Sequence, residues 1–347
     1  MFSEKLPIDL SLVNGVSGDP AIFGFFPRTG DGILLDLGHI DSLSNKDLLK
    51  VRTVLISHTH IDHFIGFDRL LRVNIPHGRE IEIYGPPGII GNVQGKLRGY
   101  LWNLLEPDQL RFTVHELSKS GDILTARLTN SSRGESRFEP EYFVSESVGC
   151  LPDETKLETM LLDHATPVVA YVLKFPCRYH VLPEVLNELR LSPGPWIRQL
   201  QVAAHNGRKE GDIEIDGKKY SLEKLIKKLL NPIKPSSLAY LTDFSFAWDN
   251  IKIIKKTLPE CCAIISESNF KDADFSKALD KKHLTTRQAA LIAAYSKASE
   301  LQTFHFSNTY TDTFDTVAGE VQSFFKEFSA EPQMTLKKLI DQEITRI

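Results

Sequence analysis

The feature that most constrains this chain is a dense histidine cluster that directly follows an apolar run. Residues 51–56 are mainly apolar and β-branched, and they lead straight into Ser57-His58-Thr59-His60-Ile61-Asp62-His63-Phe64. In an extended backbone, His58 and His60 point the same way, so both imidazoles can bind one Zn²⁺. Asp62 and His63 follow where the chain turns into a helix, and they face a second nearby position. The pattern HxHxDH after a buried strand therefore predicts a metal site at the end of that strand.

A site of this kind needs further ligands from distant parts of the chain. His164 precedes an expected strand at 170–175, Asp243 follows one at 238–242, and His305 lies in the last one at 301–306. Each residue alone is more often structural than functional. Three such residues at strand ends favour a shared site that can hold two ions.

The order of the expected elements indicates an α/β fold. Short apolar strands alternate with amphipathic helices, for example a strand at 80–84 and helices at 64–73 and 286–299. We expect one domain over residues 1–347, with residues 176–216 as an inserted arm. The stretch from Trp196 to Lys219, which begins in this arm and runs just past its end, is polar and carries turn signals at Asn206-Gly207 and Asp216-Gly217.

The bulk properties limit the classes of partner and the compartment. The formal net charge of −4 excludes a wholly basic nucleic-acid binder, so a polyanion would need a local basic patch. No apolar run approaches about 20 residues, and the N-terminus has no signal-peptide pattern. The four cysteines show no CxxC spacing, which suits reduced thiols. We expect a cytoplasmic protein with no membrane segment.

Eight short segments together resemble the metallo-β-lactamase superfamily and, within it, the ribonuclease Z family of tRNA 3′-processing endonucleases. The segments are Asp36-Leu37-Gly38, the HxHxDH cluster, Tyr84-Gly85-Pro86, Asp163-His164, Leu241-Thr242-Asp243, Ser266-Glu267-Ser268, His283-Leu284-Thr285 and His305-Phe306-Ser307. The resemblance covers most of the chain. It implies a four-layered αββα sandwich with the site at one edge.

The same resemblance assigns the ligands of two zinc ions. One ion takes His58, His60 and His164, the other takes Asp62, His63 and His305, and Asp243 bridges them. Mn²⁺ or Fe²⁺ are alternatives to zinc. Two such ions lower the pKa of a shared water and clamp the oxygens of a phosphodiester, which implies hydrolysis by a metal-activated hydroxide. Asp62 is also expected to orient the hydroxide or to take up its proton.

Two further residues receive catalytic roles from the resemblance. His283 stands where the family has a catalytic histidine, which stabilises the phosphorane charge or protonates the leaving oxygen. Glu267 is expected to hold the other nitrogen of that imidazole. The alternative for His283 is a surface histidine in a basic turn, and the alternative for Glu267 is a solvated carboxylate.

The substrate is less constrained than the metal chemistry. The segment Leu191-Ser192-Pro193-Gly194-Pro195-Trp196 resembles the Gly-Pro element of the family's tRNA-binding arm, which favours precursor tRNA and, as in that family, a homodimer. The arm looks reduced, and the net charge is acidic. Both observations favour the alternative, hydrolysis of a small phosphodiester such as a cyclic nucleotide or of another ester. A non-catalytic metal- or RNA-binding scaffold is the third class, and the complete set of seven ligands argues against it.

Overall fold

The computed structural model describes all residues except 1, 3–5, 131–137, 145–149, 259–262 and 347. The chain divides into two compact units. Unit 1 contains Met1–Leu173 and Ser237–Ile347, and unit 2 contains Lys174–Ser236. The segment expected as an inserted arm, residues 176–216, lies within unit 2.

The first sheet of unit 1 has eight strands in sequence order. They are β1 (Asp9–Leu12), β2 (Ile22–Phe26), β3 (Asp31–Leu35), β4 (Val51–Leu55), β5 (Glu80–Gly85), β6 (Arg111–Leu117), β7 (Ile123–Thr129) and β8 (Glu141–Val144). Strands β3 to β6 run parallel. Their neighbours β2 and β7 are antiparallel to them, and β1 and β8 pair antiparallel with β2 and β7. Four of the five residues of β4 are buried, as the apolar run before the histidine cluster predicts.

The second sheet of unit 1 has six strands in the order β18-β17-β16-β11-β10-β9. They are β9 (Cys150–Leu151), β10 (Thr155–Asp163), β11 (Pro167–Phe175), β16 (Ser236–Leu241), β17 (Ala263–Glu267) and β18 (Glu300–Phe304). Strands β16, β17 and β18 are parallel, so their carboxyl ends meet at one edge of the sheet.

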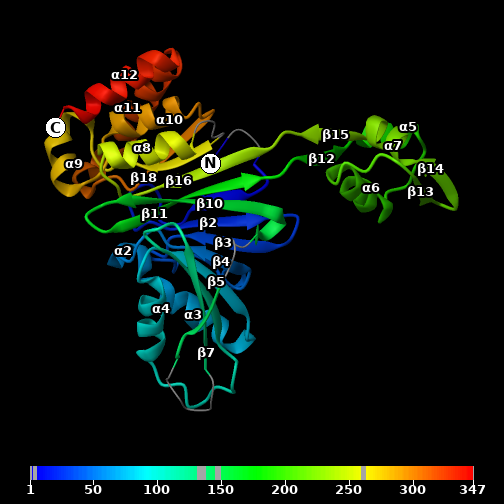
Figure 1. Cartoon of the computed structure of the whole chain (residues 1–347), viewed down its shortest axis with the longest axis horizontal. Coiled ribbons are helices and arrows are strands. Elements are labelled where there is room, and N and C mark those ends of the chain that lie inside the picture. Colours follow the sequence, from blue (N-terminus) through cyan, green and yellow to red (C-terminus); the bar gives the residue numbers. More distant parts are fainter. Residues whose placement is uncertain (1, 3–5, 131–137, 145–149, 259–262, 347) are drawn as a thin grey trace. The chain divides into compact units, whose positions relative to one another are not determined.

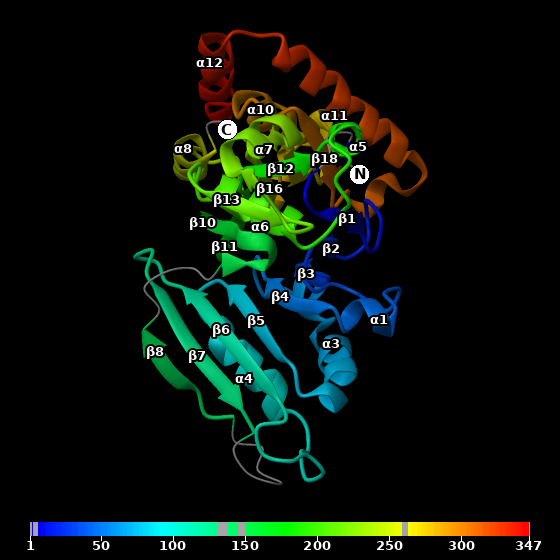
Figure 2. The same cartoon turned by 90° about the vertical axis from the view of Figure 1, so that its right-hand side faces the viewer.

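Helices cover the outer face of each sheet in unit 1 (Figures 1 and 2). On the first sheet lie α1 (Asn45–Leu48), α2 (Ile61–Phe64), α3 (Phe67–Asn74) and α4 (Ile89–Arg98); on the second lie α8 (Trp248–Thr257), α9 (Phe275–Lys281), α10 (Thr286–Tyr295), α11 (Phe314–Ser329) and α12 (Gln333–Ile344). One apolar core packs α3 and α4 against the first sheet, and another packs α8 and α10 to α12 against the second. These layers form the expected αββα sandwich, and the expected fold class is confirmed.

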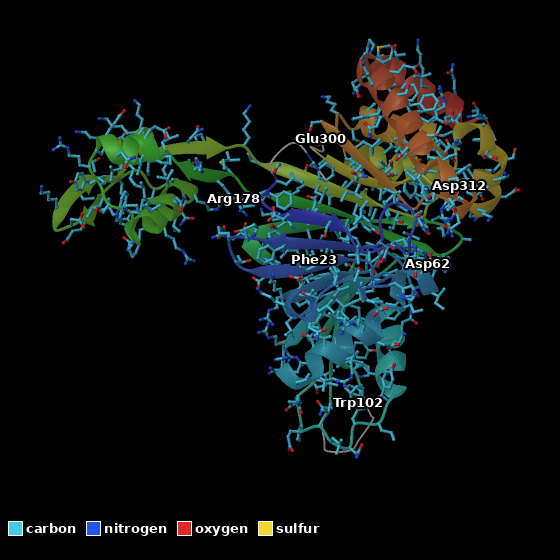
Figure 3. All side chains as sticks on the ribbon, turned by 180° about the vertical axis from the view of Figure 1, so that it is seen from behind. Phe23, Asp62, Trp102, Arg178, Glu300 and Asp312 are labelled. Atoms are coloured by element: carbon cyan, nitrogen blue, oxygen red, sulfur yellow. The ribbon has the colours of Figure 1, made fainter. Side chains whose placement is uncertain are left out.

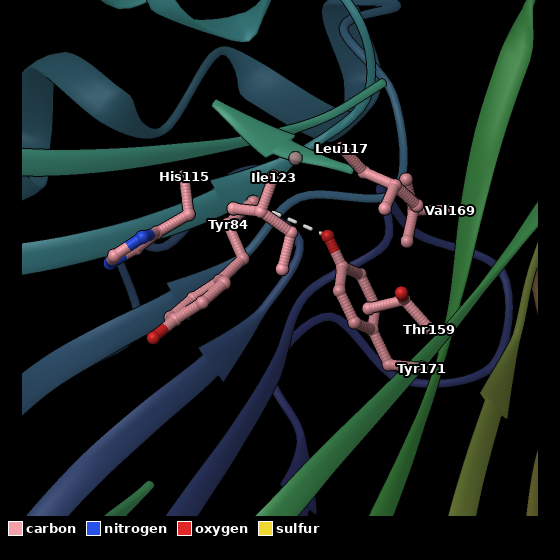
Figure 4. A pocket seen from close by; sticks show the side chains of 8 residues that line it. Tyr84, His115, Leu117, Ile123, Thr159, Val169 and Tyr171 are labelled. Atoms are coloured by element: carbon pink, nitrogen blue, oxygen red, sulfur yellow. Dashed lines mark hydrogen bonds between the residues drawn. The ribbon is translucent and has the colours of Figure 1, made fainter. Parts of the chain in front are cut away.

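Buried tyrosines of the second sheet reach the first. The hydroxyl of Tyr171 on β11 lies 2.7 Å from the main-chain oxygen of Ile56 and 3.1 Å from that of Tyr84. Figure 4 shows Tyr171 beside a cavity of about 10 Å³, where Tyr84 stacks on His115 with ring centroids 4.3 Å apart. Because Ile56 directly precedes Ser57 and His58, this contact ties the histidine cluster to the opposite sheet.

Unit 2 has a small core of its own. It contains α5 (Pro183–Glu188), α6 (Trp196–His205), α7 (Leu222–Leu229), the antiparallel pair β12 (Arg178–Val181) and β15 (Leu230–Ile233), and the hairpin β13 (Asp212–Ile215) and β14 (Lys218–Ser221). The core includes Trp196, Leu200, Ile213 and Leu225. These residues come from α6, β13 and α7, so the unit is held together by apolar side chains as well as by strand pairing.

Local signals placed some elements well and missed others. Ser44 caps α1 by accepting a hydrogen bond from the Asp47 main chain, as expected from its position. The turns predicted at Asn206-Gly207 and Asp216-Gly217 are present, and Gly207 and Gly217 adopt positive φ there. The helix α6 was missed although Trp196, Leu200 and Ala203 are spaced for one helical face. The helix α12 was missed although Leu336 and Ile340 have the same kind of spacing. Ser221 stands at the N-cap of α7 without the side-chain hydrogen bond.

None of the helices in the described part of the chain is long and apolar enough to cross a membrane.

Candidate metal centre

The seven expected ligands lie together at the ends of strands in unit 1. They are His58 and His60 after β4, Asp62 and His63 in α2, His164 between β10 and β11, Asp243 after β16 and His305 after β18. The parallel pairing of β16, β17 and β18 brings Asp243 and His305 to the same edge. Asp62, labelled in Figure 3, is partly exposed, whereas His58 and His63 are buried.

Backbone conformation directs two of these side chains. Asp243 has a φ of +48° and His305 a φ of +58°. His305 directly follows β18, and Asp243 is the second residue after β16. Non-glycine residues adopt this left-handed region rarely and at a cost of about 1–3 kcal/mol. The strands thus end in turns that are unfavourable by themselves and that aim a carboxylate and an imidazole into the site.

The first ligand group contains His58, His60, His164 and Asp243, whose ligand atoms all lie within 4.8 Å of one another. Nε2 of His58 is 2.8 Å from Nδ1 of His60 and 3.8 Å from Oδ2 of Asp243. Nε2 of His164 is 3.9 Å from the same carboxylate oxygen. Ligands of a tetrahedral zinc ion lie about 3.4 Å apart, so this group has the spacing of an ion site.

The second ligand group contains Asp62, His63 and His305. Nε2 of His63 and Nε2 of His305 each lie 3.6 Å from Oδ2 of Asp62. Oδ2 of Asp243 is 3.3 Å from Nε2 of His63, and Oδ1 of Asp243 is 2.9 Å from Nδ1 of His305. Asp243 therefore contacts members of both groups, which is the geometry of a bridging carboxylate.

Buried polar atoms and charges test whether these residues suit metal ions. Nε2 of His63 is buried and makes no hydrogen bond, although it points at two carboxylates. Burial lowers the pKa of His58 to about 2, which leaves a neutral imidazole with a free lone pair. Burial opposes protonation of His305 too, yet the charge of Asp243 raises the pKa of that imidazole to about 10. A divalent cation would satisfy the demand for positive charge that Asp243 creates, so the residues fit such ions.

The carboxylate of Asp36 accepts hydrogen bonds from several residues that surround the ligands. Its Oδ1 accepts from the main-chain N–H of Ser57 at 2.6 Å, and its Oδ2 accepts from the Ser57 hydroxyl at 2.7 Å and from Nδ1 of His63 at 2.9 Å. The hydroxyl of Tyr240 on β16 also donates to Oδ2, at 2.7 Å. These bonds fix the His63 ring so that Nε2 faces the second group. Sequence reasoning recognised Asp36 only as part of a family motif and missed Tyr240, which looks like any buried strand residue.

His283 and Glu267 form a pair next to the ligands. Nδ1 of His283 lies 2.8 Å from Oε2 of Glu267, and Oε1 accepts from the main-chain N–H of Phe244 at 3.0 Å. The His283 ring lies between the two groups, 4.8 Å from the His164 ring and 5.5 Å from the His305 ring. Burial would lower the pKa of His283, but the charge of Glu267 raises it. This arrangement can hold a proton on His283 beside the ligands.

Known proteins resemble this chain in sequence and in fold. No family model matches it. Ribonuclease Z of Deinococcus radiodurans is 31% identical over 81% of this chain and 83% of its own length. Zinc phosphodiesterase ELAC protein 1 of Bos taurus is 26% identical over 75% of this chain and 73% of its own length. The crystal structure of the metallo-β-lactamase fold protein YhfI from Bacillus subtilis superposes with a TM-score of 0.53 at 14% identity, covering 92% of this chain and 94% of that one.

The αββα sandwich with its histidine- and aspartate-rich edge defines a protein of the metallo-β-lactamase fold. The identity and the extent of the match to the Deinococcus protein show that the chain belongs to the ribonuclease Z family. The resemblance inferred from the short motifs is thereby confirmed, as is the expected class of enzyme.

Proposed function

We propose that this protein is a binuclear zinc phosphodiesterase that cleaves precursor tRNA at its 3′ end. The observation that carries the proposal is the convergence of two ligand groups on the buried carboxylate of Asp243. The family's members include a protein named zinc phosphodiesterase, and nitrogen and carboxylate ligands suit zinc, with Mn²⁺ or Fe²⁺ as alternatives. His58, His60 and His164 would hold one ion, and Asp62, His63 and His305 the other.

The protein groups around the ions have distinct tasks. Bound ions would lower the pKa of a shared water and polarise the phosphodiester. Asp62, whose pKa burial would raise but the hydrogen bond from His305 brings down to about 2, stays ionised and can orient the attacking hydroxide. His283, with its pKa raised by Glu267, can deliver a proton to the leaving oxygen. Asp62 would thus orient the nucleophile, and His283 would act as the acid.

The charge of unit 2 supports an RNA substrate. Residues 174–236 contain twelve Lys and Arg and seven Asp and Glu, a net charge of +5, whereas the whole chain carries −4. On α7 the apolar face, including Leu222, Leu225 and Leu229, is buried, so Lys224, Lys227 and Lys228 are exposed. An exposed basic face on a compact unit suits contact with a phosphate backbone. We propose that this unit acts as the substrate-binding arm of a single catalytic domain.

The substrate is tested by comparing precursor tRNA that carries a 3′ trailer with a panel of cyclic nucleotides. The double variant Lys227→Gln/Lys228→Gln should cleave the precursor more slowly, with a weaker dependence on salt concentration. The matched control, Lys252→Gln/Lys256→Gln, neutralises two exposed lysines of α8 and should leave cleavage unchanged. Turnover of a small diester without trailer cleavage would instead support the alternative substrate class, which the acidic charge of the rest of the chain favours.

Metal content, assembly and location are tested separately. We expect close to two zinc ions per chain by elemental analysis, and a preparation that is inert toward bis-p-nitrophenyl phosphate would contradict the enzyme proposal. We also propose a homodimer in the cytoplasm, from family membership. Light scattering of the purified protein and fractionation of cells test these two points.

A further inference from the structure

One buried amide links the two turns that carry His164 and Asp243. Asn250, on α8, is 2% exposed. Its Oδ1 accepts from the main-chain N–H of Asp163 at 2.8 Å, and its Nδ2 donates to the main-chain oxygen of Asp163 at 2.9 Å. Nδ2 also lies 2.9 Å from the main-chain oxygen of Ser245. Asn250 therefore binds the residue before one ligand and the residue two positions after another.

Other contacts also restrict the turn that carries His164. The main-chain N–H of Ser245 donates to the oxygen of Asp163 at 3.2 Å, which brings the two turns together directly. Beyond His164 the chain reverses through Ala165, whose φ is +59°. At the far end of the imidazole, Nδ1 of His164 lies 2.8 Å from the main-chain oxygen of Lys282. The ring is thus fixed at Nδ1, and Asn250 fixes the backbone from which it projects.

Only an amide matches all of these partners. The site offers one N–H donor and two carbonyl acceptors, and asparagine supplies one acceptor and two donors. Aspartate, of nearly the same size, would place an oxygen against both carbonyls. Because Nε2 of His164 and Oδ2 of Asp243 are 3.9 Å apart, a small shift between the turns changes the spacing of two ligands of one ion.

We propose that Asn250 is a positioning residue for the ion held by His58, His60, His164 and Asp243, and that it sets the separation of His164 from Asp243. The inference rests on the metal-dependent function proposed above. Removing a group that orients a ligand typically lowers metal affinity by about 10- to 100-fold. The effect of Asn250 should be larger at this ion than at the other, because His164 serves only this ion, whereas Asp243 also contacts His63 and His305.

The test measures zinc affinity of each ion by competition with a chelator, together with the visible spectrum of the Co²⁺-substituted protein. Asn250→Ala and Asn250→Asp should weaken the ion held by His164 by about 10- to 100-fold and the other ion by less. Asp249→Asn, an exposed neighbour on the same helix, should match the wild type. In the double variant His164→Ala/Asn250→Ala, affinity should fall no further than in His164→Ala, since the amide acts through that ligand.

Other results overturn the inference. Unchanged affinity in both Asn250 variants, equal weakening of both ions, or additive losses in the double variant would each contradict it. Thermal melting of the chelator-treated variants separates misfolding from a local effect on the site. If Asn250→Ala does not fold, the zinc affinity of Asn250→Asp decides whether the inference holds. A wild-type protein that binds no ion, or a His164→Ala variant with full affinity, would refute the proposed metal centre itself. Two ions in the wild type with no effect of Asn250 would refute only the positioning role.

Discussion

The hydroxyl of Tyr240 lies 2.7 Å from Oδ2 of Asp36, and both side chains are fully buried. Tyr240 belongs to β16 of the second sheet, and Asp36 follows β3 of the first. The same carboxylate oxygen accepts from Nδ1 of His63. The hydrogen bond from Tyr240 to Asp36 joins the two sheets, and through Asp36 it helps to orient the ligand His63.

Replacing Tyr240 with Phe should reduce both stability and metal affinity. A hydrogen bond to a charged group contributes about 1.5–3 kcal/mol, so the free energy of unfolding should fall by about 2 kcal/mol. Zinc affinity at the His63 group should also fall, because Asp36 loses one of its partners. Tyr171→Phe is the matched control: it loses a bond to main-chain oxygens and not to Asp36, so it should weaken stability and leave zinc affinity intact. Urea denaturation and chelator competition measure the two effects.

The activity of a Lys282 variant should depend on the backbone conformation that the new residue prefers and not on its charge. Its φ of +57° turns its main-chain oxygen toward His164 and places His283 in the site. Lys282→Gly and Lys282→Val both remove the ammonium group, but glycine adopts the left-handed region freely and valine does not. Cleavage of bis-p-nitrophenyl phosphate should be nearly normal in the first variant and strongly reduced in the second. Equal rates in the two variants would show that this conformation is unimportant.

Glu267 should set the alkaline limit of activity. Burial opposes the effect, but the charge of Glu267 raises the pKa of His283, and an acid catalyst is lost as pH rises through its pKa. Glu267→Gln removes that charge, so the decline in rate should begin at a lower pH than in the wild type. His283→Ala should lower the rate about 10²- to 10⁴-fold while metal content stays at the wild-type level. Rate measurements across pH check the first result, and a lost ion in His283→Ala would contradict the assigned role.

His115 should make the protein less stable in acid. Burial lowers the pKa of His115 to about 4 in the folded state, below its ordinary value of about 6.5. Between these values the unfolded chain takes up a proton that the folded protein excludes, so stability falls as pH drops. The loss from this residue is about 2 kcal/mol between pH 7.5 and pH 5.

The variant His115→Gln tests this point, because it retains a polar partner for Thr125 and does not titrate. Its free energy of unfolding in urea should change less between pH 7.5 and pH 5 than that of the wild type. An identical pH dependence would assign the acid sensitivity to other groups.

Local sequence signals accounted for the strand that leads into the histidine cluster and for much of the helix expected over residues 64–73, where α3 spans Phe67–Asn74. They did so because a buried strand and an amphipathic helix have apolar patterns with periods that can be read along the chain. The same signals failed for β10, where apolar and polar residues mix because tertiary packing selects the buried face. Family resemblance supplied the distant residues His283 and Glu267, which no spacing rule connects.

The sequence by itself determined the chemistry of the candidate site: imidazoles and carboxylates clustered at strand ends, and a chain related to ribonuclease Z. Only the tertiary structure decided how those groups are held. The contacts of Tyr240 with Asp36, of Lys282 with His164 and of Asn250 with Asp163 join residues about 87 to 204 positions apart. Each contact is a hydrogen bond, buried or partly buried, between residues that the tertiary fold brings together, and it leaves no local pattern in the chain.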